Sequence, residues 1–294
     1  MTQPEESLPR TARSFLFVPA DRPSRIATAL SSEADAVIVD LEDAVRPEAR
    51  AAARAGLAAA VNGANKPVFV RVNPLGSPDF AADVEAALAA GVTGILLAKF
   101  VPGNPSSTLD EDLSAREARF DRAVPLAVIG LIESASGVIG LTSAATLPRR
   151  ITQLAWGAAD LHLDVALSPR SNGGIADFAM AALVLASRAA GLPAPLDSPC
   201  FLVERETGDG NMEVLTEDVA RARNRGFGGK LCIHPRQLAA VNEGFAPTPD
   251  ERAWALAVVA AWDDPSRGGR GAIAVAGELV DEAVILRARQ LLLY

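Results

Sequence analysis

Short runs of apolar and β-branched residues recur along the chain, and each is followed by a longer segment whose apolar positions have helical spacing. The runs are continuously apolar, which is typical of parallel strands covered on both faces. The segments between them are long enough to form right-handed helical crossovers. Eight runs have this character: residues 14–18, 36–40, 68–72, 94–98, 126–132, 151–156, 200–203 and 230–233.

This rhythm predicts an α/β fold, a TIM (β/α)8 barrel over residues 1–245, with a C-terminal helical extension over residues 246–294 that acts as a lid or oligomerisation segment. The clearest helices, at residues 47–61, 78–90 and 174–190, begin with Pro or Gly and are followed within two residues by Gly. A doubly wound open sheet is the alternative. No Gly-x-Gly-x-x-Gly motif follows an early strand, so we favour the barrel.

Two regions interrupt this alternation of predicted strands and helices. Residues 101–108 read as a polar Pro/Gly loop, and residues 110–122 as a charge-dense helix with a solvated face. In the extension, helical patterns at residues 249–262 and 279–293 flank a Gly-rich linker at residues 263–271. We assign no chemistry to the segment from 101 to 122.

Composition and charge narrow the class of protein. The chain has 294 residues, of which 49% are hydrophobic and 22% charged, as in ordinary globular proteins. Its two cysteines provide no disulfide framework and point to the cytoplasm. No apolar run approaches the ~20 residues that span a bilayer. A net charge of −8 and scattered aromatic residues argue against nucleic-acid binding. We therefore expect a cytoplasmic protein that binds neither membranes nor nucleic acid.

Ionisable residues stand at the ends of five successive predicted strands. Barrel enzymes place their catalytic groups at these C-terminal ends, where loops are free to vary above rigid strands. Taken singly, such a residue is more often a solvent contact or a structural ion pair. Five in a row predict a ring of carboxylates with one Arg and one Lys, formed by Asp40 with Glu42, Arg71, Lys99, Glu133 and Asp160.

Glu133 and Asp160 follow adjacent strands one βα unit apart, so their carboxylates are expected to converge on one ion. Oxygen ligands favour Mg²⁺ or Mn²⁺ over zinc. His162 and His234 lack the spacing of a zinc-binding helix and are interpreted as structural. No Gly-x-Ser-x-Gly motif supports a serine hydrolase. The residues alone therefore favour a Mg²⁺ site that handles a small acid.

Six motifs occur in a fixed order along the chain. They are FLFVP at 15–19, DLEDAV at 40–45, VRVN at 70–73, IES at 132–134, GAAD at 157–160, and GK with IHPRQ at 229–230 and 233–237. In this order they resemble the citrate lyase β-subunit-like branch of the HpcH/HpaI aldolase/citrate lyase family, which includes malyl-CoA and citramalyl-CoA lyases. The resemblance implies a Mg²⁺-dependent barrel that makes or breaks a carbon–carbon bond between an acyl-CoA enolate and a keto acid.

The resemblance also implies roles for single residues. Glu133 and Asp160 would be the metal ligands, with Glu133 also contacting the substrate, and Arg71 would clamp the substrate carboxylate. Asp40 and Glu42 are interpreted as residues that order metal-bound water behind these ligands. Three further residues fall where such enzymes contact or frame the CoA entrance: Phe17, Arg25 and Lys230.

The extension carries a Gly-x-x-x-Asp motif at residues 277–281. In the family its Asp reaches the active site of a neighbouring subunit, which makes Asp281 the acid/base candidate and implies a homo-oligomer, a trimer or a multiple of one. The alternative is an ordinary C-terminal helix docked on its own barrel.

The chain departs from the family pattern at Ala20, Ala98 and Glu282. A CoA-independent class II aldolase acting on 4-hydroxy-2-keto acids is therefore an alternative, as is a non-catalytic barrel that binds an acyl-CoA or a dicarboxylate. The presence of both metal carboxylates and of Asp281 favours an enzyme, because a binding protein needs no acid/base group.

Overall fold

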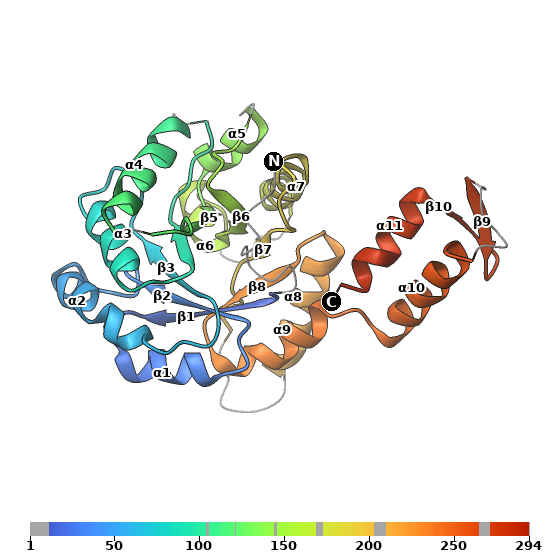
Figure 1. Ribbon diagram of the computed structural model, residues 1–294, viewed down its shortest axis with the longest axis horizontal. Helices are drawn as coiled ribbons and strands as arrows, with labels where there is room; N and C mark the ends of the chain where they lie inside the picture. Colours follow the sequence, from blue (N-terminus) through green and yellow to red (C-terminus); the bar gives the residue numbers. More distant parts are fainter. Residues whose placement is uncertain are drawn as a thin grey trace.

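The computed structural model describes residues 12–103, 106–120, 122–143, 146–168, 173–202, 210–264 and 271–293. Parallel strands in sequence order, β1 to β8, close into a barrel in which β1 pairs with β8, so the predicted TIM barrel is confirmed (Figure 1). The strands are β1 (Ser14–Pro19), β2 (Ala36–Asp40), β3 (Val68–Val72), β4 (Gly94–Leu97), β5 (Ala127–Ile132), β6 (Ile151–Trp156), β7 (Leu196–Asp197) and β8 (Gly229–Cys232).

Helices surround this barrel on the outside (Figure 1). They are α1 (Pro23–Ser31), α2 (Arg50–Val61), α3 (Phe80–Ala89), α4 (Ser106–Arg119), α5 (Ala135–Ser143), α6 (Ala158–Asp164), α7 (Ile175–Ala189), α8 (Gly210–Asn224) and α9 (Leu238–Phe245), with single 3-10 turns η1 (Pro47–Ala49) and η2 (Pro235–Gln237). Among the described residues, no helix combines the length and apolar character needed to cross a membrane.

Alternate residues of each strand face opposite sides of the barrel wall, as the two-residue period of a strand requires. One side forms a buried cluster inside the barrel that includes Phe15, Ile38, Phe69 and Leu131. The other side packs against the helices in a larger core. Continuing the inward register toward the C-terminal ends of β2, β3 and β5 leads from these apolar residues to polar ones, and this places the candidate site at the barrel mouth.

One predicted strand is wrong. Residues 200–203 were expected to form the seventh strand, but β7 consists of Leu196 and Asp197, and residues 200–202 are in no strand; Val203 lies outside the described residues. Phe201 is 60% exposed, so its apolar character does not reflect a position in the barrel wall. The true strand is short, stands between prolines and contains a buried Asp, so its sequence lacks a continuous apolar run.

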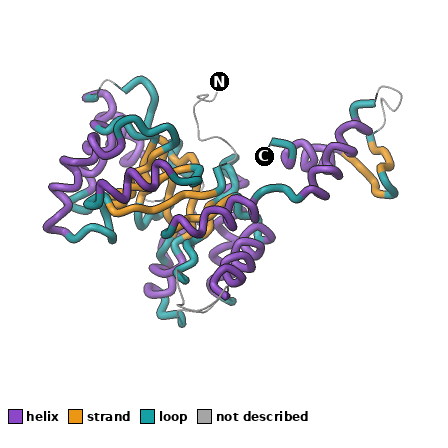
Figure 2. Tube along the Cα trace, turned by 90° about the horizontal axis from the view of Figure 1, so that it is seen from below, coloured by secondary structure: helices purple, strands orange, loops and turns teal. Residues whose placement is uncertain are grey.

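The tail comprises α10 (Pro249–Trp262), β9 (Ala272–Val275), β10 (Glu278–Asp281) and α11 (Glu282–Leu291). The helix expected over residues 279–293 therefore begins three residues later, because residues 278–281 pair antiparallel with β9. The helical extension thus also contains a two-stranded sheet. Buried residues such as Val258, Ile273 and Ile285 give the tail a core of its own. The tail projects away from the barrel in both views (Figures 1 and 2).

Candidate active site

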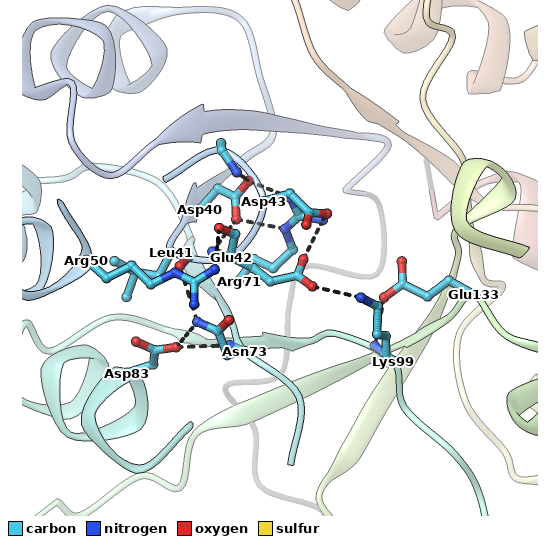
Figure 3. Close-up of polar contacts among 11 residues, drawn as sticks. Asp40, Leu41, Glu42, Asp43, Arg50, Arg71, Asn73, Asp83, Lys99 and Glu133 are labelled. Carbon is cyan, nitrogen blue, oxygen red and sulfur yellow. Dashed lines mark hydrogen bonds and ion pairs between the residues drawn. The ribbon is translucent and has the colours of Figure 1, made fainter. Parts of the chain in front are cut away.

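Charged side chains from β2, β3, β4 and β5 meet at the mouth of the barrel, as Figure 3 shows. Asp40 and Arg71 face each other across the paired strands β2 and β3. Lys99 follows β4 and Glu133 follows β5. Because these strands are neighbours in the barrel, strand ends separated by about thirty residues in the chain supply one cluster.

Arg71 is the most heavily paired residue of the cluster. Its Nε and Nη2 donate to the two carboxylate oxygens of Asp40 at 2.8 and 2.6 Å. Its Nη1 lies 3.0 Å from Glu42 Oε2 and 3.3 Å from Asp43 Oδ2. The guanidinium carbon lies 5.1 Å from the centre of the Phe17 ring. Burial alone would lower the pKa of Arg71, but the Asp40 and Glu42 carboxylates raise it above its usual value, so the side chain stays charged.

Asp40 anchors this arrangement from within the barrel. Besides the two bonds from Arg71, it accepts the backbone N–H of Glu42 at 2.9 Å and that of Ala44 at 3.2 Å. The carboxylate is buried, and each of its two oxygens accepts two of these hydrogen bonds. The structure therefore makes Asp40 the residue that orients Arg71 and shapes the β2 loop. Its predicted contact with metal-bound water stays a prediction.

Glu42 connects the two basic side chains of the cluster. Its Oε2 faces Arg71, and its Oε1 lies 3.5 Å from Lys99 Nζ. Burial raises the pKa of Glu42 to about 7; Arg71 and Lys99 lower it, whereas Asp43 and Asp40 raise it. Because Asp43 is largely exposed, it is the carboxylate of this group most readily displaced from Arg71.

Glu133 is 3% exposed, and its Oε1 accepts the backbone N–H of Lys99 at 2.7 Å. Burial raises the pKa of Glu133 to about 8; the Lys99 N–H lowers it, whereas the charges of Asp160 and Glu42 raise it. Gly157 makes room for this side chain, since a Cβ there would lie 2.5 Å from Glu133 Cβ and 2.7 Å from its Oε2. A larger residue at position 157 would displace the carboxylate.

Asp160 stands in the first turn of α6 and is partly exposed. The start of this helix is fixed by Gly157 N–H donating to the Ile132 carbonyl at 2.9 Å and by Ala158 N–H donating to Ser198 Oγ at 3.2 Å. The charge of Asp160 is close enough to Glu133 to raise the pKa of that residue. The two residues thus follow the neighbouring strands β5 and β6, and convergence of their carboxylates on one ion stays a prediction.

The donor set of the cluster fits a Mg²⁺ ion. Five carboxyl groups, those of Asp40, Glu42, Asp43, Glu133 and Asp160, surround the cations Arg71 and Lys99, so the cluster carries excess negative charge. Within the described ranges, no three His, Cys, Asp or Glu side chains converge closely enough to hold an ion by themselves. Mg²⁺ needs only one or two protein carboxylates, because it keeps several waters and accepts substrate oxygens. A pair of carboxylates therefore suffices, and the assignment of Glu133 and Asp160 as that pair stays a prediction.

Of the three residues expected at the CoA entrance, Phe17 stands in β1 and Arg25 in the first turn of α1, which follows it. Phe17 is partly buried at the end of β1 and packs against the inner cluster, with its ring beneath Arg71. Arg25 is exposed on α1, and no carboxylate pairs with it in the part of the chain that the structure describes. Contact of either residue with CoA stays a prediction.

Lys230 is not brought to this site. It is 1% exposed, and its Nζ pairs with Asp197 of β7 and, at 2.6 Å, with Asp218 of α8. Its neighbour Leu231 belongs to the inner cluster, so Lys230 points out of the barrel toward the helices. We correct its expected role: Lys230 holds α8 to the barrel wall and does not frame a ligand entrance.

Asp281 lies at the end of β10. Figure 1 shows β10 in the tail, which projects away from the barrel. It is exposed, and its Oδ1 accepts the backbone N–H of Val284 at 3.0 Å, so it is the N-cap of α11. A role in catalysis therefore requires the tail of another copy to reach this barrel mouth.

Sequence reasoning gave no role to Asp43 or Gly157 and gave Lys99 no role beyond its place in the ring of charges. Asp43 and Gly157 both lie inside motifs that were quoted, DLEDAV and GAAD, so the signal was present. Lys99 contacts Glu133 through its backbone N–H, and the residue type gives no signal for a backbone contact of this kind.

Comparisons with known proteins show the family of the chain. The model of the HpcH/HpaI aldolase/citrate lyase family matches residues 13–235. A citrate lyase subunit beta-like protein from Deinococcus radiodurans is 35% identical, over 97% of each chain. An L-malyl-CoA/beta-methylmalyl-CoA lyase from Cereibacter sphaeroides is 31% identical, over 95% of this chain and 93% of its own.

Among solved structures, CitE from Mycobacterium tuberculosis in complex with magnesium, acetoacetate and coenzyme A has a TM-score of 0.74 and 31% identity, covering 96% of this chain and 98% of its own. The family match spans most of the chain, and relatives at 30% identity or more cover nearly all of it. The chain therefore belongs to the HpcH/HpaI aldolase/citrate lyase family.

Proposed function

We propose that the chain is a Mg²⁺-dependent carbon–carbon lyase of the citrate lyase β-subunit type, which cleaves or forms a bond between an acyl-CoA-derived enolate and a keto acid. One observation carries the proposal: at the C-terminal end of the barrel the Lys99 N–H holds the buried Glu133 carboxyl, Glu42 links Lys99 to the Arg71–Asp40 pair, and Asp160 follows the neighbouring strand. Relatives that are malyl-CoA lyases, and a CitE structure holding magnesium, acetoacetate and coenzyme A, support it.

Glu133 and Asp160 would hold the metal, with water and substrate oxygens as the remaining ligands. When bound, Mg²⁺ supplies a Lewis acid that polarises the oxygen of the reacting carbon. Arg71 meets the substrate carboxylate with the edge that faces Glu42 and Asp43, because its Nε edge is held by Asp40. The exposed Asp43 would give way to the substrate carboxylate at this edge.

In the cleavage direction, a base removes the proton of the substrate hydroxyl. The bond between the hydroxyl-bearing carbon and the α-carbon of the thioester then breaks, which leaves a keto acid and a thioester enolate. An acid returns a proton to the enolate carbon, so atoms and charge balance. Asp281, supplied by the tail of a neighbouring copy in a homo-oligomer, a trimer or a multiple of one, is our candidate for this acid/base group.

We place this enzyme in the cytoplasm. Cys200 and Cys232 are both buried free thiols, and burial raises the pKa of Cys232 to about 12. Such thiols are inert structural residues of a kind common in reducing compartments.

Replacement of the buried metal carboxylate tests the proposal. Glu133→Gln should abolish Mg²⁺ binding measured by isothermal titration calorimetry while leaving the thermal unfolding curve in place, because strand-end carboxylates at the catalytic face contribute little to the core. Glu85→Gln, on the outer surface of α3, is the matched control and should bind Mg²⁺ normally. Mg²⁺ affinity that is undiminished in Glu133→Gln would remove Glu133 from the metal site.

Substrate class is tested with a panel of 3-hydroxyacyl-CoA thioesters and free 4-hydroxy-2-keto acids, each with and without Mg²⁺. We expect cleavage of a thioester only when Mg²⁺ is present. Cleavage confined to the free acids would identify a CoA-independent aldolase. Binding without turnover of any compound would identify a non-catalytic barrel.

A further inference from the structure

The backbone of Lys99 adopts a left-handed conformation with φ of 51°, which non-glycine residues rarely adopt. The chain around it is held in place from the side of β5. Phe100 N–H donates to the Leu131 carbonyl at 3.0 Å. The Phe100 ring lies so close to Gly130 that a Cβ there would be 2.5 Å from it. This packing turns the Lys99 N–H toward Glu133, which it contacts at 2.7 Å.

The side chain of Lys99 lies on the same side of the turn and reaches the other half of the cluster (Figure 3). Its Nζ lies 3.5 Å from Glu42 Oε1, while Glu42 Oε2 lies 3.0 Å from Arg71 Nη1. Glu42 is therefore bracketed by two cations, one on each oxygen. Burial lowers the pKa of Lys99, whereas the charges of Glu42, Asp160, Glu133 and Asp43 raise it.

Lys99 thus links the two halves of the cluster. Its backbone N–H contacts Glu133, and its ammonium lies near Glu42, which pairs with Arg71. We propose that Lys99 is a positioning residue: its N–H fixes Glu133, and its ammonium is the resident cation that balances Glu42 and leaves the positive charge of Arg71 available to an anionic substrate. This inference rests on the proposed function, because it concerns the Mg²⁺ and keto-acid subsites of that site.

The proposal makes predictions of opposite sign for two ligands. Without the ammonium, the carboxylates around the metal position lose a competing cation, so Mg²⁺ should bind more tightly. The negative charge of Glu42 is then balanced by Arg71 alone. Less of the positive charge of Arg71 is available to a keto acid, so the keto acid should bind more weakly. A residue that only stabilised the fold would weaken both ligands together.

The experiment uses three variants of the full-length enzyme. Lys99→Met removes the charge, Lys99→Gly removes the side chain but accepts the left-handed backbone, and Lys99→Arg restores a cation. All keep the N–H that holds Glu133. The control is Arg119→Met, which removes a cation from a surface pair with Glu85. Calorimetry measures Mg²⁺ binding to the ligand-free enzyme and then pyruvate binding at saturating Mg²⁺.

For Lys99→Met and Lys99→Gly we expect Mg²⁺ binding roughly three- to ten-fold tighter and pyruvate binding roughly five-fold weaker, with both changes shrinking at high salt. Lys99→Arg should return both constants toward wild type, and Arg119→Met should change neither. Unchanged constants, or Mg²⁺ and pyruvate both weakened, in the Met and Gly variants would overturn the proposal. Wild-type enzyme that does not bind Mg²⁺ would instead overturn the proposed function.

Discussion

At the mouth of the barrel, the space for the Glu133 side chain depends on a glycine at position 157. Gly157 has φ of −110°, a conformation open to any residue, so only its missing side chain is needed. A Cβ there would approach Glu133 Oε2 to 2.7 Å. The requirement is therefore steric and specific to the buried carboxylate.

Gly157→Ala should displace Glu133 and weaken Mg²⁺ binding at least about ten-fold, with a loss of about 1–3 kcal/mol in the free energy of unfolding from overpacking. Calorimetry and urea denaturation measure the two effects. The matched control is Gly56→Ala in α2, where nothing lies within 4 Å of the added methyl group. This control should be stabilised by about 0.5–1 kcal/mol. Normal Mg²⁺ binding in Gly157→Ala would show that the metal does not need Glu133 in this position.

Residues of the site differ in how far sequence alone could place them. Asp40, Arg71 and Glu133 stand at strand ends, where barrel geometry predicts that side chains converge. Lys230 also stands in a strand, but a continuously apolar strand gives no sign of which alternate positions face inward. Its outward direction is set by the register of β8 against β1 and β7, which no local pattern encodes.

At the scale of elements, α3 braces the loops that carry the site. Asp83 is fully buried and accepts from the Asn73 backbone N–H at 2.9 Å, from Asn73 Nδ2 at 2.7 Å and from Arg54 Nη1 at 2.8 Å. Asn73 Nδ2 also donates to the Leu41 carbonyl at 3.2 Å, next to Glu42. One helix thereby holds the loops after β2 and β3 together (Figure 3).

Asp83→Ala should lower the free energy of unfolding by about 2–3 kcal/mol, because it leaves the buried Asn73 N–H without an acceptor and removes one of the two carboxylates that Arg54 contacts. Chemical denaturation measures this loss. The control lies on the same helix: Glu85→Ala removes a more exposed carboxylate that pairs with Arg116 and Arg119 and should cost about 1 kcal/mol or less. Equal losses in the two variants would mean that the loops are not braced through Asp83.

Elements with long apolar runs were the ones that sequence predicted well. The strands at 36–40, 68–72 and 151–156 and the helix at 249–262 have the predicted bounds. The seventh strand was predicted wrongly because its two residues form no recognisable apolar run, whereas the nearby residues 200–203 are more apolar. In the tail, the last run of apolar residues contains both β10 and α11, and only pairing with β9 separates them.

At the scale of the whole molecule, the tail is a unit beside its own barrel. Its core is separate from the barrel cores, and Arg223 Nη2 of α8 pairs with Glu251 Oε2 of α10 at 2.6 Å where the two parts join. Leu279 is 72% exposed and Leu286 53% exposed, so the tail presents apolar side chains to its surroundings. Exposed apolar residues on a projecting unit favour an interface with another copy.

The trans role of Asp281 is tested by mixing two inactive variants. Asp281→Asn keeps an N-cap for α11 but removes the acid/base group, whereas Asp281→Ala would also destabilise the helix. Glu133→Gln supplies an intact tail with a disabled metal site. If each active site combines the barrel of one copy with the tail of another, random co-assembly with Asp281→Asn should restore about a quarter of wild-type activity. Light scattering and affinity tags on both variants verify that mixed oligomers form. Mixed oligomers without activity, or full activity in Asp281→Asn alone, would exclude the trans role, because in neither case does a neighbour's carboxylate complete the site.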